Sequence, residues 1–296
     1  MKILVTGSYG QLGNEMQVEA RRHKEAECLF TDADTLDICD KDALERRVAE
    51  EKPDYIVNCA AYTAVDKAED DEAAAHRVNV DAVSNIGETA ARHGVKVIHV
   101  STDYVFDGNG HLPYTEDMPV APTNVYGRTK LAGERALLEA DRDAIIIRTA
   151  WLYSSFGNNF VKTMLRLGRE RSTLGVVFDQ IGSPTYAADL AKAIFTVICS
   201  GRWTPGIYHF SNEGVCSWYD FTKAIHEAAG ITTCDVKPIE SSEYKYRTPR
   251  PSYSVLNKRK IKEVYGVEVP YWVESLRRCI GILEGKQTED IPTVNG

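Results

Sequence analysis

Ile3-Leu-Val-Thr-Gly7-Ser-Tyr-Gly10-Gln-Leu-Gly13 opens the chain with a short apolar run that leads into a glycine-rich turn. The residues that follow, Asn14 to His23, have the composition of a helix. A strand, a glycine turn and a helix in this order form a phosphate-binding element, because glycine lets backbone N–H groups approach a diphosphate at the positive end of the helix. The GxxGxxG spacing departs from the GxGxxG of ordinary dehydrogenases. We predict a dinucleotide-binding turn here, with a plain strand-to-helix turn as the alternative.

Further apolar runs alternate with helical patterns, which is typical of a parallel sheet covered by helices. The expected strands are 28–31, 55–58, 95–100 and 144–149, and the expected helices between them are 42–51, 73–93 and 129–140. In the second half the pattern predicts helices at 160–170, 186–199 and 217–229. We predict an α/β fold with a doubly wound, Rossmann-type parallel sheet and a smaller α/β C-terminal domain. Residues 1–151, joined by helix 186–200, would bind the dinucleotide, and residues 152–296 would mainly bind the substrate.

The overall composition limits the kinds of partner. The 296 residues carry a net charge of −8, whereas nucleic-acid binding requires a basic face. Seven cysteines lie scattered without a CxxC pair, which indicates reduced thiols and a cytoplasmic setting. The apolar runs are shorter than the roughly 20 residues of a membrane span. We therefore expect neither nucleic acid nor a membrane as a partner.

An acidic residue follows the second expected strand. Asp32 lies 19 positions after Gly13, where a carboxylate would bind the adenosine ribose hydroxyls and repel the 2′-phosphate of NADP. Asp34 and Asp37 compete for this role, and Asp37 with Ile38 could line the adenine pocket. Small residues after the third strand, in Cys59-Ala60-Ala61-Tyr62, would let the backbone pass close to the same ligand.

Tyr126 and Lys130 are four residues apart at the head of an expected helix, so they share one helical face. A fixed cation stabilises a phenolate and lowers the tyrosine pKa from its usual value of roughly 10. Such a tyrosine can exchange a proton with a sugar alkoxide. Thr102 stands at the carboxyl end of the fourth expected strand, at the edge where parallel sheets bind ligands. The alternative is a surface tyrosine beside a solvated lysine.

Several longer motifs carry a resemblance to a known family. They are Asn58-Cys-Ala-Ala-Tyr-Thr-Ala-Val-Asp-Lys-Ala-Glu69, Ser101-Thr-Asp-Tyr-Val-Phe106, Asn124-Val-Tyr-Gly-Arg-Thr-Lys-Leu-Ala-Gly-Glu134, Arg148-Thr-Ala-Trp-Leu-Tyr153 and Asp179-Gln-Ile-Gly-Ser-Pro-Thr185. With the glycine turn, they make the whole chain similar to the extended short-chain dehydrogenase/reductase superfamily. Within it, the chain resembles reductases of nucleotide-linked 4-keto-6-deoxy sugars.

This resemblance implies that hydride passes from NADPH or NADH to the C4 carbonyl of a nucleotide sugar. Tyr126 would donate the proton, Lys130 would hold the nicotinamide ribose and lower the pKa of the tyrosine, and Thr102 would bond the carbonyl oxygen. The predicted cofactor site consists of Gly7, Tyr9, Gly10, Gln11, Leu12, Gly13, Asp32, Asp37, Ile38, Ala60, Ala61, Tyr62, Asn79, Tyr126 and Lys130. A regulatory binding subunit on the same fold, or a nucleotide-sugar epimerase or dehydratase, are the alternatives.

The resemblance also implies a substrate site. Besides Thr102 and Tyr126, it places Tyr104, Phe106 and Trp151 around the sugar, and Asn159 and Arg250 nearer the diphosphate. Phe106 and Trp151 could instead belong to the core between domains, and Arg250 could be a solvated basic residue. Lys67 and Glu69 are interpreted as a surface pair outside the site.

Some members of the superfamily bind Mg²⁺ at a dimer interface through acidic residues. Glu15 is present here, but Thr185-Tyr-Ala-Ala-Asp189 carries one acid where a carboxylate pair is expected. We therefore assign no metal ligands, keep a Mg²⁺-bridged dimer as the alternative, and expect a monomer or a homodimer.

Overall fold

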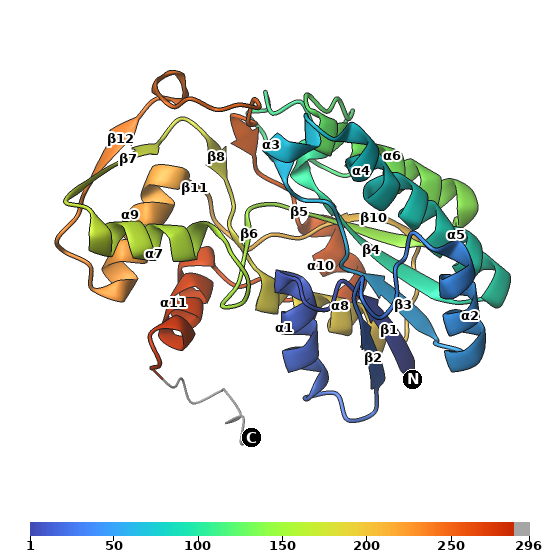
Figure 1. The fold of residues 1–296 in the computed structure, drawn as a ribbon. Helices are drawn as coiled ribbons and strands as arrows, with labels where there is room; N and C mark the ends of the chain where they lie inside the picture. The colour runs from blue at the N-terminus through green and yellow to red at the C-terminus, as the bar shows by residue number, and fades with distance from the viewer. Residues whose placement is uncertain (287–296) are drawn as a thin grey trace.

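A six-stranded parallel sheet forms the centre of the computed structural model, which describes residues 1–286 (Figure 1). The strand order is β10-β5-β4-β3-β1-β2. The strands are β1 (Lys2–Thr6), β2 (Glu27–Thr31), β3 (Tyr55–Asn58), β4 (Lys96–Thr102), β5 (Ile145–Thr149) and β10 (Gly206–His209). The chain runs outward from β1 in both directions, to β2 on one side and to β3, β4 and β5 on the other, so a crevice opens beyond the carboxyl ends of β1 and β3. The predicted fold class is confirmed.

Helices cover both faces of this sheet, which explains why its inner strands are apolar on both sides. One face packs against α1 (Gln11–Ala20), α8 (Ala187–Cys199) and α10 (Arg259–Tyr265). The other packs against α2 (Lys41–Glu51), α5 (Ala82–His93) and α6 (Val125–Ala140). None of the helices in residues 1–286 is long and apolar enough to cross a membrane.

The helix expected over 73–93 is interrupted. It consists of α4 (Glu72–His76), a π-helical segment (Arg77–Asp81) and α5, which ends as predicted at Gly94 with a φ of 68°. Two short helical segments flank the crevice, α3 (Val65–Ala68) and a 3₁₀ turn (Asp103–Val105). A π-helical turn is rare and often lies at a functional site, and here it contains Asn79.

A smaller lobe contains most of the second half of the chain and lies at the left of Figure 1. Its helices are α7 (Phe160–Glu170), α9 (Trp218–Ala229), α11 (Trp272–Leu283) and a 3₁₀ turn (Ser241–Glu243). Its strands are β6 (Leu152–Tyr153), β7 (Thr173–Val177), β8 (Ile181–Gly182), β9 (Thr185–Tyr186), β11 (Cys216–Ser217), β12 (Asp235–Ile239) and β13 (Tyr253–Ser254). The predicted helices at 160–170 and 217–229 are confirmed, and Ser217 forms a capping box with Asp220.

Two polar contacts join the lobe to the first helix of the sheet domain. The Ser154 hydroxyl donates to a Glu15 carboxylate oxygen at 2.6 Å, and Asn159 Nδ2 donates to Gln11 Oε1 at 2.9 Å. Because Gln11 directly follows the glycine turn, these contacts set the position of the lobe relative to that turn.

Candidate active site

A cleft of about 580 Å³ lies at the carboxyl edge of the sheet. Residues of the glycine turn, the end of β4, the start of α6 and the segment after β5 line it together. Thr102, Tyr126 and Lys130 all face this cleft, opposite Gly10 and Gln11. The structure thus brings the predicted catalytic residues to the predicted dinucleotide turn.

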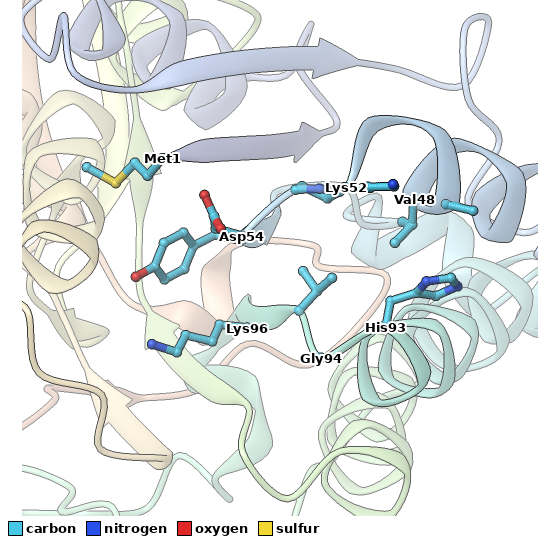
Figure 2. Close-up of a pocket in the computed structure, with 11 residues that line it drawn as sticks. Met1, Val48, Lys52, Asp54, His93, Gly94 and Lys96 are labelled. Atoms are coloured by element: carbon cyan, nitrogen blue, oxygen red, sulfur yellow. The ribbon is translucent and has the colours of Figure 1, made fainter.

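A larger cavity, of about 840 Å³, lies at the opposite edge of the sheet. Figure 2 shows Met1, Asp54, His93 and Lys96 around it, near the amino ends of β1, β3 and β4. Since parallel sheets bind ligands beyond the carboxyl ends of their strands, we assign the active site to the smaller cleft.

The glycine turn has no room for side chains. Gly7 has a φ of 67°, and a Cβ added there would lie 2.6 Å from Ala60 N. A Cβ on Gly13 would lie 2.2 Å from Gly7 O. Gly10 is the N-cap of α1, and in the described structure it makes no side-chain hydrogen bond to the helix. The first N–H groups of α1 therefore remain able to bind an anion. This geometry fits a dinucleotide diphosphate.

Asp32 supports the glycine turn through backbone hydrogen bonds. Its carboxylate accepts hydrogen bonds from Tyr9 N at 2.7 Å and Ala33 N at 2.8 Å. Asp37 lies further along and forms an ion pair with Arg77 at 3.1 Å. Ile38 is buried in the core beneath the sheet, so its side chain contributes to packing and does not form an open wall for adenine.

Asn79 holds the loop that contains Ala60 and Ala61. Its Oδ1 accepts from Tyr62 N at 2.9 Å, and its Nδ2 donates to Tyr62 O and to Thr129 Oγ1, both at 3.1 Å. The residue is 1% exposed and its side-chain bonds go to Tyr62 and Thr129, which supports a positioning role, while the predicted direct cofactor contact stays a prediction. Asn79 is a positioning residue that ties Tyr62 to α6.

Burial raises the pKa of Tyr126 to about 12, and hydrogen bonding from Thr102 only partly opposes this effect. The prediction that Lys130 lowers the pKa of this tyrosine is therefore wrong for this structure. The reason is geometric: Lys130 Nζ donates to Val100 O at 2.8 Å and lies 3.2 Å from His99 Nε2. Tyr126 is protonated at neutral pH, as a proton donor must be.

A buried chain of polar side chains lies behind Lys130. Asn58 Oδ1 accepts from Thr6 Oγ1 at 2.7 Å and from Ala60 N at 3.1 Å, so its Nδ2 donates to His99 Nδ1 at 3.0 Å. His99 therefore carries its proton on Nε2, which faces Lys130. Burial lowers the pKa of Lys130 to about 8 and holds that of His99 well below its usual range.

In the neutral form of Lys130, which its pKa of about 8 makes accessible just above neutral pH, the amine accepts this proton while it donates to Val100 O. The sequence alone did not reveal this network. The available signal was His99 between apolar neighbours, in Val97-Ile-His-Val100 of β4.

The head of α6, which carries Tyr126, is fixed by two side chains. Asn124 Oδ1 caps the helix by accepting from Gly127 N at 2.8 Å, and Glu69 Oε1 accepts from Val125 N at 2.8 Å. Glu69 is exposed, as the interpretation of a surface residue stated, but it is not without consequence, because it holds the first turn of the helix that carries Tyr126. Its distance of 56 positions from Val125 in the chain concealed the contact.

Trp151 and Asn159 form the wall of the cleft opposite Tyr126. Trp151 adopts a φ of 49°, which is unusual for a bulky residue, and its ring stacks on Trp218 with centroids 3.5 Å apart. Asn159 caps α7 and bonds Gln11. Tyr104 also lines the cleft, with its ring edge-on to Tyr126 at 5.4 Å.

Two predicted substrate residues lie behind this surface. Phe106 is 1% exposed and stacks on Tyr114 with centroids 4.2 Å apart, so it belongs to the core, as the alternative interpretation stated. Arg250 forms an ion pair with Asp66 at 2.8 Å and hydrogen-bonds Tyr104. Arg250 lies beside the cleft wall and contacts it through its hydrogen bond with Tyr104.

The two acids considered for Mg²⁺ already have partners within the chain. Asp189 binds Arg278 and Ser275, each at 2.5 Å, and Glu15 accepts from Ser154. A carboxylate neutralised by arginine is a poor metal ligand.

The Rossmann-type sheet, the glycine turn and the threonine, tyrosine and lysine in one cleft define an oxidoreductase of the extended short-chain dehydrogenase/reductase class. The family described as "RmlD substrate binding domain" matches residues 1–284, and the chain belongs to this family.

Named relatives cover almost all of the chain. It is 42% identical to the spore coat polysaccharide biosynthesis protein SpsK of Bacillus subtilis, covering 94% of this chain and 96% of that one. It is 41% identical to the dTDP-4-dehydrorhamnose reductase of Aggregatibacter actinomycetemcomitans, covering 93% and 97%. The crystal structure of dTDP-4-dehydrorhamnose reductase from Bacillus anthracis in complex with NADP superposes with a TM-score of 0.90 at 39% identity, covering 94% and 98%.

Proposed function

We propose that the protein reduces dTDP-4-dehydro-6-deoxy-L-mannose at C4 with NADH or NADPH and forms dTDP-L-rhamnose, as the names of its relatives indicate for those proteins. The observation that supports this activity best is the single cleft in which Thr102, Tyr126 and Lys130 face the glycine turn. The family membership supports the choice of substrate.

The dinucleotide would lie along the glycine turn, with its diphosphate at the N-terminus of α1. The reduced nicotinamide supplies the hydride when it is bound. We infer that Asp32 accepts the adenosine ribose hydroxyls, because it stands at the end of β2 with its carboxylate already aligned by Tyr9 N. A carboxylate there favours NADH over NADPH.

Proton transfer is the step that this chain's own residues perform. As the carbonyl carbon accepts hydride, negative charge develops on the oxygen. The Thr102 and Tyr126 hydroxyls, which both line the cleft, would bond that oxygen, with the Thr102 hydroxyl turning from Asp103 Oδ1 to do so. The Tyr126 phenol then gives its proton to the alkoxide. The raised pKa of about 12 keeps this proton in place until the alkoxide, a stronger base than a phenolate, forms.

Lys130 would leave His99 to bond the nicotinamide ribose. Its pKa of about 8 lets it gain or lose a proton near neutral pH, so it can return a proton toward Tyr126 after each turnover. His99 and Asn58 hold the Lys130 amine in the position from which it would move to the ribose.

The substrate would lie between Tyr126 and the wall formed by Trp151 and Tyr104. Aromatic faces suit the C–H faces and methyl group of a deoxysugar. We infer that residues 1–151, completed by α8 and β10, bind the dinucleotide, and that the remaining residues from 152 onward mainly bind the nucleotide sugar. The contact of Asn159 with Gln11 supports a site shared by the two parts.

The test is a coupled measurement on the purified protein. NADH or NADPH absorbance should fall only when the 4-keto sugar nucleotide is added, with one dinucleotide oxidised per sugar reduced. A regulatory subunit would bind the dinucleotide without consuming it, and an epimerase or dehydratase would retain bound NAD through each cycle. Absence of ketosugar-dependent oxidation with either cofactor would refute the proposed activity.

A further inference from the structure

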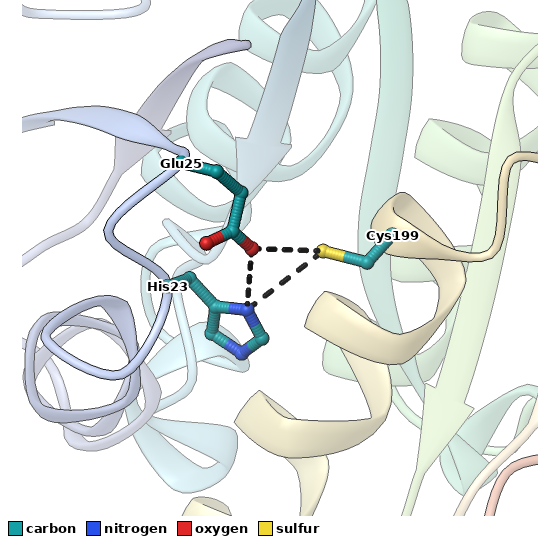
Figure 3. A group of neighbouring side chains, drawn as sticks. All are labelled: His23, Glu25 and Cys199. Carbon is teal, nitrogen blue, oxygen red and sulfur yellow. Dashed lines mark hydrogen bonds and ion pairs between the residues drawn. The ribbon is translucent and has the colours of Figure 1, made fainter.

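His23, Glu25 and Cys199 form a cluster on the surface far from the cleft. His23 and Glu25 lie in the loop between α1 and β2, and Cys199 is the last residue of α8. Figure 3 shows the three donor atoms turned toward one point between the loop and the helix end. This point lies at the amino end of β2, whereas Thr102 and Tyr126 lie at the carboxyl edge of the sheet.

The spacing of the donor atoms matches that around a tetrahedral ion. His23 Nδ1 lies 3.2 Å from Glu25 Oε1, Cys199 Sγ lies 3.8 Å from Nδ1, and Sγ lies 4.0 Å from Oε1. With metal–nitrogen and metal–oxygen bonds of about 2.0–2.1 Å and a metal–sulfur bond of about 2.3 Å, tetrahedral geometry requires donor separations of roughly 3.3–3.6 Å. Changes of a few tenths of an ångström would complete the site.

The surroundings of His23 resemble those of a metal-binding histidine. Its other ring nitrogen, Nε2, lies 3.4 Å from Glu19 Oε1, and a carboxylate in this position fixes the tautomer that leaves Nδ1 free to ligate. The ring also stacks on Phe195 with centroids 4.4 Å apart and planes 6° apart, which holds it in orientation. The histidine is thus oriented before any ion binds.

We propose that His23 Nδ1, Glu25 Oε1 and Cys199 Sγ bind one divalent cation of the zinc class, with water in the fourth position. A thiolate, an imidazole and a carboxylate together favour Zn²⁺ over Mg²⁺ or Ca²⁺, which prefer oxygen ligands. The ion would tie the α1–β2 loop to the end of α8, and so join two helices that cover the same face of the sheet. Its role would be to stabilise the sheet domain, without contact to the reaction.

The same residues could also be interpreted as a nucleophilic cysteine with its histidine base. The Glu25 carboxylate argues against this, because it lies 4.0 Å from the sulfur and would repel a thiolate that has no cation beside it. A bound cation removes that repulsion, since both anions become its ligands.

The test uses the full, untagged chain after treatment with a chelator. Titration with Co²⁺ should produce a thiolate-to-cobalt absorption band at one ion per chain, and Zn²⁺ should displace it. Zn²⁺ should also raise the thermal midpoint of the parent protein. Cys199→Ser should abolish the band and weaken Zn²⁺ binding at least tenfold, and Glu19→Gln should weaken it about tenfold while keeping the band.

Cys234→Ser is the matched control, because Cys234 is a free cysteine in the other lobe. It should retain the band and the shift in thermal midpoint. Ketosugar reduction by NAD(P)H should be unchanged in Cys199→Ser, which shows that the variant is folded. A folded parent protein that gives no band, or a band that persists in Cys199→Ser, would overturn the proposal.

Discussion

The two sides of the cleft are built by different means. On the cofactor side, the sheet holds Lys130 through buried hydrogen bonds that cross three strands, from Thr6 through Asn58 to His99. On the substrate side, Trp151 is held by stacking on Trp218, a residue 67 positions away in the smaller lobe. If the proposed roles hold, chemistry depends on the sheet and recognition on the lobe. Variants on the two sides should therefore affect different kinetic constants.

The largest effect is expected on the cofactor side, from Tyr126→Phe. The variant lacks the proton donor but keeps the ring that packs edge-on to Tyr104. We expect kcat to fall at least about 100-fold, the scale of one lost general acid, while the variant still binds the dinucleotide. Steady-state kinetics and a binding titration with NADH measure the two quantities. Turnover at the parent rate would show that another group supplies the proton.

Trp151→Ala is the corresponding change on the substrate side. It removes the stacked partner of Trp218 and one wall of the cleft, but no group that transfers a proton. We expect KM for the nucleotide sugar to rise about tenfold, since an aromatic contact of this kind contributes on the order of 1 kcal/mol beyond its buried area. The KM for NADH should stay the same.

Trp203→Ala is the matched control for this variant, because Trp203 lies on the far side of the sheet and donates to Asp143 O. Its KM for the sugar should equal that of the parent. If Trp151→Ala lowered kcat as strongly as Tyr126→Phe without changing KM, the proposed division between chemistry and recognition would be wrong.

The same contrast explains what the sequence could predict. The glycine turn and the Tyr126 and Lys130 pair are local patterns, because their spacing along the chain already defines their geometry. The helix at 160–170 was correct to the residue because its apolar face follows the helical period.

What the sequence could not predict depends on contacts between distant residues. Glu69 caps α6 from another loop, and His99 bonds Lys130 across 31 positions. Phe106 and Trp151 are both aromatic residues after a strand, yet one is buried against Tyr114 and the other lines the cleft. The two placements are decided by packing against residues distant in the chain, Tyr114 and Leu256 for Phe106 and Trp218 for Trp151.

A smaller effect is expected from Asp32→Ser, which tests cofactor choice on the cofactor side alone. Serine removes the charge that repels a 2′-phosphate and can still accept from Tyr9 N. The ratio of kcat/KM for NADPH to that for NADH should rise several-fold, on the scale of about 1 kcal/mol. The KM for the sugar should not change. An unchanged cofactor ratio would place the ribose contact at another residue, such as Asp34 or Asp37.

An effect on stability, with no change expected in the chemical step, is predicted where the two sides meet, at Glu15. Burial raises the pKa of this carboxyl from 4.5 to about 7, although the Ser154 hydrogen bond opposes the increase. Between about pH 4.5 and 7, the folded protein therefore keeps a proton on Glu15 that the unfolded chain has released. The resulting stabilisation is complete below about pH 4.5 and is lost as the pH rises through about 7.

Glu15→Gln keeps a group that can bond Ser154 but has no proton to lose. Relative to the parent, the variant should therefore gain about 2 kcal/mol in free energy of unfolding between pH 4.5 and pH 7.5, an order-of-magnitude figure from the size of the pKa change. Urea unfolding at the two pH values measures this difference, and groups that titrate in both proteins cancel. Glu50→Gln, at an exposed position on α2, should show no such gain. If Glu15→Gln and the parent showed the same pH dependence, the contact between Glu15 and Ser154 would be solvated. The two sides of the cleft would then move more freely than this hydrogen bond implies.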